Sequence, residues 1–84
     1  MNTEEAIRRA ARAGELMNDP LIKEGFESID AHIDLRWRES PLDAADEREE
    51  LFRLHVAARM FRAFFQTVVD GGKLAKASNP ERIT

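Results

Sequence analysis

The sequence predicts an all-α protein, and three observations lead to this prediction. Apolar residues recur three and four positions apart across two long stretches, which is the spacing of a helix face. Glycine and proline total only seven of 84 residues and charged residues make up 35% of the chain, a composition that favours helices. Stop and start signals for helices stand at Asp19–Pro20 and Ser40–Pro41. We therefore expect three helices in a single domain covering residues 1–84.

The first predicted helix, within residues 1–18, is the weakest of the three. Thr3 is expected to cap it, and Glu4 and Glu5 favour the positive end of the helix dipole. Its apolar residues are mostly alanine, and Gly14 costs about 1 kcal/mol relative to alanine in a helix. We expect this helix to be short or frayed.

The second predicted helix, residues 19–39, begins with a strong signal. Asp19 is a good N-cap, and Pro20 occupies the first helical position, where its missing N–H costs nothing. One apolar stripe with spacings of 4, 3, 4 and 4 consists of Ile22, Phe26, Ile29, Ile33 and Trp37. Because Trp37 closes this stripe, we interpret it as a core side chain folded over the following turn. Stacking on a nucleic-acid base beside Arg36 and Arg38 is the alternative.

The third predicted helix covers residues 43–70, with Asp43 or Asp46 as its cap. We expect it to end at Gly71–Gly72, a typical C-cap, and residues 73–84 to form a loose tail. A heptad seam comprises Leu51, Leu54, Ala58, Phe61, Phe65 and Val68. A second apolar stripe, on nearly the opposite side, comprises Phe52, Val56, Met60 and Ala63.

A helix that is apolar on two sides is usually buried between neighbours. The second helix can cover one side as the partner in an antiparallel helical hairpin. The first helix is thin, so we expect another subunit on the other side, with two hairpins forming a dimeric four-helix bundle. The predicted core or interface residues are Trp37, Phe52, Val56, Met60, Phe61, Phe64 and Phe65.

Charge is unevenly placed in this acidic chain, whose net charge is −3. Residues 43–50 contain five acids and one arginine, whereas residues 53–76 contain five bases and one acid. The candidate contacts to an anion or a partner are Arg8, Arg9, Arg12, Arg59 and Arg62. The interpretation we favour for the third helix is that its polar stripe pairs with the acidic stripe of the second. These stripes are His55, Arg59, Arg62 and Gln66 on one helix, and Glu27, Asp30 and Asp34 on the other. Exposed pairs of this kind contribute about 0–1 kcal/mol each.

The sequence offers no catalytic motif. There is no cysteine or tyrosine, no serine nucleophile in a recognisable pattern with histidine, and no glycine-rich phosphate loop opening a helix. Asp30 and Asp34 share a helix face, but His32 points about 160° away from them, so these three side chains cannot converge on a metal. We expect no enzymatic activity, no cofactor and no metal.

No apolar run approaches the ~20 residues of a membrane span, and the N-terminus lacks the apolar centre of a signal peptide. We therefore expect a cytoplasmic protein without membrane contact.

Several of these signals together resemble a family of small helical proteins of uncharacterised function that tailed phages and prophages encode, often among virion-assembly genes. The shared pattern covers residues 16–77 and reads Leu16 to Pro20, Phe26, Trp37, Ser40–Pro41, Arg48–Glu49 with Leu51, and Gly72–Lys73. This chain departs from it in "MNDP", where a leucine-rich stretch is usual, and in its Phe64–Phe65 pair. The resemblance implies a phage or prophage context in a bacterial host and a non-enzymatic role.

From these observations we expect a small interaction or assembly factor that acts by helix-to-helix packing, as a homodimer and with another phage or host protein. Two alternatives remain open at this point. One is a nucleic-acid-binding accessory protein that uses the arginines. The other is an inhibitor of a host defence enzyme, whose acidic segment 43–50 would imitate phosphate.

Overall fold

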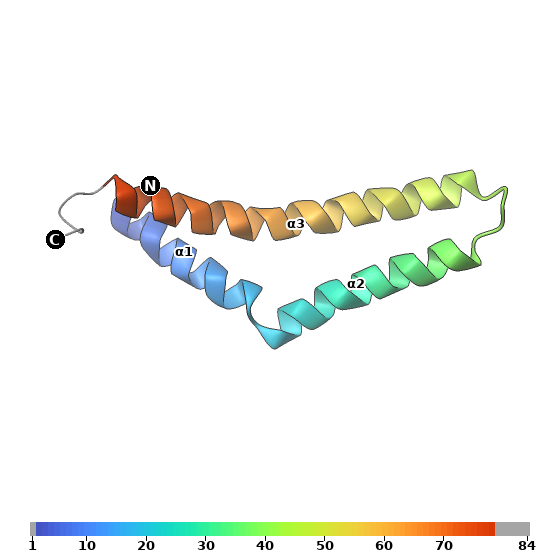
Figure 1. Cartoon of the computed structure of the whole chain (residues 1–84), viewed down its shortest axis with the longest axis horizontal. Helices are drawn as coiled ribbons and strands as arrows, with labels where there is room; N and C mark the ends of the chain where they lie inside the picture. The colour runs from blue at the N-terminus through green and yellow to red at the C-terminus, as the bar shows by residue number, and fades with distance from the viewer. Residues whose placement is uncertain (1, 79–84) are drawn as a thin grey trace.

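The computed structural model describes residues 2–78, which form three α-helices and no strand (Figure 1). These are α1 (Thr3–Met17), α2 (Pro20–Glu39) and α3 (Ala45–Ala77). α1 and α2 follow one another along the same side of α3, with α1 beside its C-terminal part and α2 beside its N-terminal part (Figure 1). The molecule is a long, flat body of 61 × 23 × 16 Å. The prediction of an all-α protein is confirmed.

The start of α2 is capped as predicted, and the start of α1 is not. Asp19 Oδ1 accepts hydrogen bonds from the backbone N–H groups of Leu21 at 2.8 Å and Ile22 at 3.3 Å. At α1 the capping side chain is Asn2 rather than Thr3, and its Oδ1 accepts the N–H of Glu5 at 2.7 Å. Asparagine and threonine both accept such bonds, so the helix begins one residue earlier than predicted.

The α2–α3 connection is held by an arginine. Arg48 Nη1 donates to the Pro41 carbonyl at 2.7 Å and to Ser40 Oγ at 3.2 Å, and its Nη2 donates to the Leu42 carbonyl at 3.0 Å. The predicted aspartate caps are wrong, because the N-cap is Ala44 and no side chain caps it. The guanidinium fork reaches several acceptors at once, so it fixes this turn from the side of α3.

A second arginine joins α2 to α3 beside this connection. Arg36 donates from Nε and Nη2 to Glu47 Oε1. The hydrogen bond and the negative charge of Glu47 raise the pKa of the Arg36 guanidinium. The pair lies near the surface, so its contribution to stability is small.

α3 is longer than predicted, because it continues through Gly71–Gly72 to Ala77. Neither glycine has a positive φ, so neither acts as a left-handed C-cap. Gly72 is buried instead, and a Cβ added there would overlap Ala10 Cβ and lie 3.3 Å from the Ala6 carbonyl oxygen. The expected loose tail is therefore helical over residues 73–77, and its last part, 79–84, lies outside the described residues.

The first helix is not short, and it is packed along α3. α1 runs for 15 residues and packs against α3 more closely and more extensively than α2 does. Its alanines are the reason, because small side chains let two helix backbones approach. Ala13 is buried, and Ala10 lies against Gly72. The alanines that leave α1 with few large apolar side chains therefore also allow it to pack close to α3.

The core is a single line along α3. Its buried residues are seven apart and consist of Leu51, Ala58, Phe65 and Gly72. Ile33 of α2 and Ala13 of α1 complete it. The other members of the predicted heptad seam include Leu54 and Phe61, which are 39% and 56% exposed. Because α1 and α2 lie end to end, they bury one stripe of α3 and no more.

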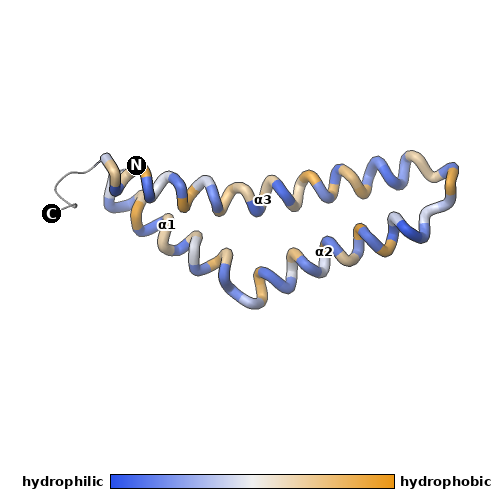
Figure 2. The backbone as a smooth tube through the Cα atoms, in the orientation of Figure 1, coloured by the Kyte–Doolittle hydropathy of each residue, from blue (hydrophilic) through white to orange (hydrophobic). Residues whose placement is uncertain are grey.

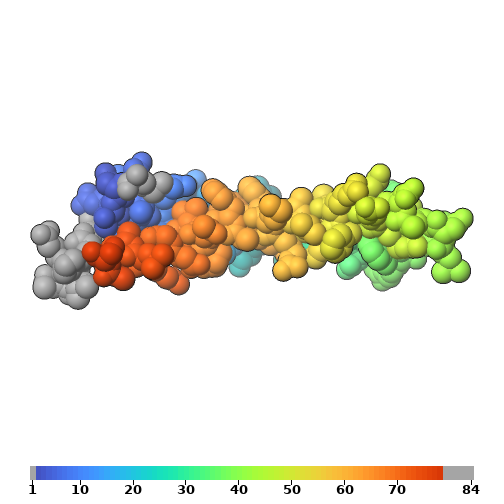
Figure 3. All heavy atoms as spheres, turned by 90° about the horizontal axis from the view of Figure 1, so that it is seen from above, coloured from blue at the N-terminus to red at the C-terminus, as the bar shows by residue number. Residues whose placement is uncertain are grey.

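The outer side of α3 therefore stays uncovered along its length (Figure 3). Hydrophobic and hydrophilic positions alternate along all three helices (Figure 2). Met60, Phe61 and Phe64 of α3 are among the exposed large apolar residues.

The two glycines of α3 make a matched test of the α1–α3 contact. We expect Gly72→Ala to destabilise the protein by about 1–3 kcal/mol, because its methyl group must push α1 away. Gly71→Ala is the control. No atom lies within 4 Å of its added Cβ, so it should stabilise the protein by about 0.5–1 kcal/mol through helix propensity. Urea denaturation followed by circular dichroism measures both, and equal effects would contradict this packing.

The role of Arg48 predicts that lysine cannot replace it. We expect Arg48→Lys to lower the free energy of unfolding by about 1–2 kcal/mol, because one ammonium cannot reproduce the bonds of both Nη atoms. Arg53→Lys is the control, since its exposed pair with Glu49 is worth about 0–0.5 kcal/mol. Denaturation curves with indistinguishable midpoints for the two variants would refute the assignment.

Candidate functional site

One continuous apolar surface extends over α2 and α3. Two shallow hollows define it. The first is lined by Leu21, Ile22, Gly25, Phe26, Ile29 and Phe61, and the second by Ala57, Met60, Phe61 and Phe64. Phe61 belongs to both hollows, so they adjoin. We call these nine residues the apolar face.

Four large side chains of the apolar face are strongly exposed, whereas Ile22, Phe26 and Ile29 are half-buried. Leu21 is 73% exposed, Met60 68%, Phe61 56% and Phe64 52%. Single exposed apolar residues are normal on protein surfaces, whereas contiguous ones mark interaction sites. The apolar face is therefore the strongest candidate for a binding surface.

An aromatic cluster anchors this surface to the core. The Phe61 ring lies 5.1 Å from that of Phe65 and 5.9 Å from that of Phe26, between ring centroids. The Phe64 ring lies 5.8 Å from Phe65 in an edge-to-face arrangement. Since Phe65 is buried, the two exposed rings of α3 rest on a fixed one. Their orientation is thus largely set before any partner binds.

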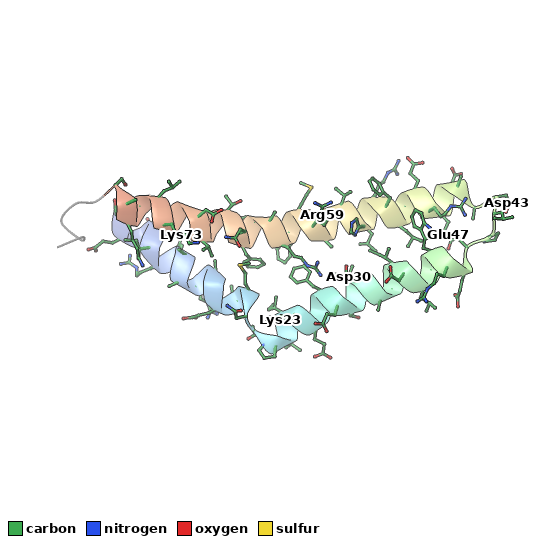
Figure 4. The ribbon with its side chains drawn as sticks, in the orientation of Figure 1. Lys23, Asp30, Asp43, Glu47, Arg59 and Lys73 are labelled. Carbon is green, nitrogen blue, oxygen red and sulfur yellow. The ribbon has the colours of Figure 1, made fainter. Side chains whose placement is uncertain are left out.

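The polar stripes of α2 and α3 meet at a neighbouring groove. Arg62 Nη2 donates to Asp30 Oδ2 at 2.9 Å, and its guanidinium carbon lies 4.5 Å from the centroid of the Phe26 ring. Asp30 lies on the side of α2 that faces α3 (Figure 4). The groove is lined by Asp30, Ile33, Asp34, His55, Arg59 and Arg62. The predicted pairing between the stripes is confirmed for Arg62 and Asp30, which are both about 40% exposed.

Several predicted core or interface residues are on the surface. Trp37 is 45% exposed, Phe52 57% and Val56 36%. The interpretation of Trp37 as a core side chain is wrong, because the buried line ends at Ile33 on α2 and Trp37 lies one turn beyond it. Of the seven residues predicted for the core or an interface, only Phe65 is buried.

The five candidate arginines do not form one surface. Arg8, Arg9 and Arg12 lie on α1, whereas Arg59 and Arg62 lie in the middle of α3. Arg12 donates to Glu15 at 3.1 Å, as Arg62 does to Asp30. Arg9 lines a hollow with Phe64 and Gly71, next to the apolar face.

Sequence reasoning missed two α2 residues of the apolar face, Leu21 and Gly25, because both lie outside the predicted apolar stripe. In the structure Gly25 has open space around it and lies in the first hollow, between larger neighbours. Leu21 and Gly25 are one helical turn apart on the same side of α2. This apolar residue beside a glycine was the signal in the sequence that could have predicted the hollow.

Two other kinds of site are absent from the described part of the chain. Among residues 2–78, no group of three or more histidine, aspartate or glutamate side chains is placed to hold a metal ion. Within the same residues, no helix combines the length and the apolar character needed to cross a membrane.

The division of the aromatic cluster into a buried and an exposed part can be measured. We expect Phe65→Ala to destabilise the protein by about 3 kcal/mol, because it leaves a cavity at the buried line. Phe64→Ala should cost less than about 1 kcal/mol in dilute solution, since its ring is half exposed. Thermal unfolding at low protein concentration compares the two. A larger loss for Phe64→Ala would invert the assignment.

Comparisons with known proteins found no relative, so the proposal for the function is based on the apolar face. No protein-family model, no curated protein and no solved structure matches this chain. The likeness to small phage-encoded proteins therefore stays a prediction based on motifs.

Proposed function

We propose that this chain is a non-enzymatic protein-interaction factor that binds a helical surface through its apolar face. The observation that carries the proposal is the contiguity of exposed Met60, Phe61 and Phe64 with exposed Leu21 on the neighbouring helix. Such side chains are typical binding anchors when a partner removes them from water.

The energetics support binding by helix packing. Each buried Å² of apolar surface contributes about 25 cal/mol, and a phenylalanine side chain offers on the order of 150–250 Å². Phe61 and Phe64 are already held against buried Phe65. Their rings therefore lose little conformational freedom on binding, so more of the burial energy remains as affinity.

The shape of the molecule supports a partner that completes the core. Its radius of gyration is 18.2 Å, whereas a compact chain of this length has about 12 Å. Its accessible surface is 6590 Å², against roughly 5100 Å² for a compact protein of this mass. This excess is larger than the roughly 800 Å² that each partner of a standard interface buries, so the chain has enough surface for such a contact.

The proposed assembly pairs α2–α3 hairpins from two subunits into a four-helix bundle, with each α1 flanking it. In the phage or prophage context that the sequence motifs imply, further partners would be virion or host proteins in the bacterial cytoplasm. The nucleic-acid and defence-inhibitor alternatives have no specific observation in their favour. Two of the candidate arginines already donate to carboxylates, and the net charge is negative.

A pull-down with matched variants tests the proposal. Tagged chain is expressed in cells that carry the native phage or prophage, and the eluate is treated with nuclease before mass spectrometry. We expect the unmodified chain to retain a stoichiometric protein partner. Phe64→Ser should reduce its capture at least tenfold, because it removes an anchor of the apolar face.

Leu42→Ser is the control, because Leu42 is fully exposed but lies in the α2–α3 connection, outside the apolar face. It should capture the partner as the unmodified chain does. Equal capture by Phe64→Ser, or loss of all partners on nuclease treatment, would overturn the proposal.

A further inference from the structure

We infer that the apolar face binds a second copy of this chain in antiparallel orientation, about a two-fold axis near Phe61 and Phe64. The inference rests on the proposed function and names the first partner of that surface. It follows from the sequence pattern of α3, the form of the apolar face, and the charge at the two ends of the molecule.

α3 carries a second heptad seam beside its buried line. Its residues, spaced 3, 4, 3, 4, 3 and 4, are Leu54, Ala57, Phe61, Phe64, Val68, Gly71 and Ala75. Each of them is exposed or half-buried in the single chain. A run of apolar residues with this spacing forms a straight stripe that fits another helix. No charged residue interrupts it, which is unusual for a helix side meant to face water.

The apolar face suits a copy of itself. A two-fold axis perpendicular to α3 brings the same patch of both chains together, so the patch must present both projections and hollows. Phe61 and Phe64 project, while Ala57 and Gly25 leave hollows on either side of Phe61. With the axis between the two rings, Phe61 of each subunit opposes Phe64 of the other, so two equivalent aromatic contacts form.

The charges of the two ends favour the antiparallel orientation. The end with the α2–α3 connection, residues 34–50, contains seven acids and three arginines, a net charge of −4. The opposite end, residues 3–13 with 70–78, contains three acids and five bases, a net charge of +2. Asp43 and Glu47 lie at the first end, and Lys73 lies toward the second (Figure 4).

Antiparallel pairing sets the acidic end of each subunit beside the basic end of the other. Parallel pairing sets two acidic ends side by side, and like charges in such positions are unfavourable. The dipoles of the two α3 helices also oppose each other only in the antiparallel dimer. The charge distribution of the chain thus commits the second copy to one orientation.

The chain contains no cysteine, so a single introduced cysteine carries the only spin label of each subunit. Leu42→Cys carries a label at the acidic end, on a fully exposed position. In the antiparallel dimer the two labels are roughly 60 Å apart, since about twenty residues separate each from the axis at 1.5 Å per residue. In a parallel dimer they are within roughly 20 Å, because paired helices lie about 8–10 Å apart.

Ala63→Cys is the matched label near the axis, on the exposed outer side of α3. It should give a short distance between subunits in either orientation. Double electron–electron resonance measures both distances, and light scattering measures the mass. We expect the mass of two chains, a long distance at residue 42 and a short one at residue 63. Phe64→Ser should raise the dissociation constant of the dimer at least tenfold.

Results that contradict the antiparallel dimer can be distinguished from results that contradict the proposed function. A short distance at residue 42 overturns the antiparallel orientation. The mass of a single chain with no distance at either label overturns self-pairing, and so does a dimer that Phe64→Ser leaves intact. In either case, capture of a different protein that Phe64→Ser abolishes would still support the interaction function.

Discussion

The close contact between α1 and α3 at Gly72 is the constraint on which the rest of the structure depends. It fixes α1 against the C-terminal part of α3 through small residues. The chain then turns at Asn18 and Asp19, so α2 can only continue along the same side of α3 (Figure 1). Where the two short helices meet, a cleft of about 240 Å³ remains, lined by Met17, Lys23, Phe26, Glu27, Arg62 and Phe65. One side of α3 is thus covered by α1 and α2, while its other side remains exposed.

This arrangement makes one aromatic cluster serve two purposes. Phe65 belongs to the interior, and Phe61 and Phe64 rest on it while facing outward. A change in the interior would therefore alter the surface directly, without any intermediate element. The polar side of the same helix is separated from it by Arg62, which joins Phe26 and Asp30. α3 thus has an apolar side, which carries Phe61 and Phe64, and a polar side, on which Arg62 pairs with Asp30 of α2.

Local signals were enough to predict the helices, the Asp19–Pro20 start of α2 and the Arg62–Asp30 pairing, because each depends on neighbours in sequence or on one helix pair. Gly72 was misread because a glycine pair after an apolar run usually ends a helix. In the structure α3 continues through Gly72, which lies against Ala10, sixty-two positions earlier in the chain. Phe61 and Phe65 lie on one heptad seam, and which of them is buried depends on where α1 and α2 lie. Composition and spacing do not contain that information.

Contacts near both of its ends hold α3 in place. α1 holds it beside Gly72, the Arg48 bonds hold its other end, and its middle passes over the place where α1 and α2 diverge (Figure 1). In this middle part of α3, Met60 and Phe61 are exposed. A second helix packed along the middle of α3 would restrict its bending. The proposed binding on the apolar face would therefore stiffen the molecule over the part of α3 that lies between its two end contacts.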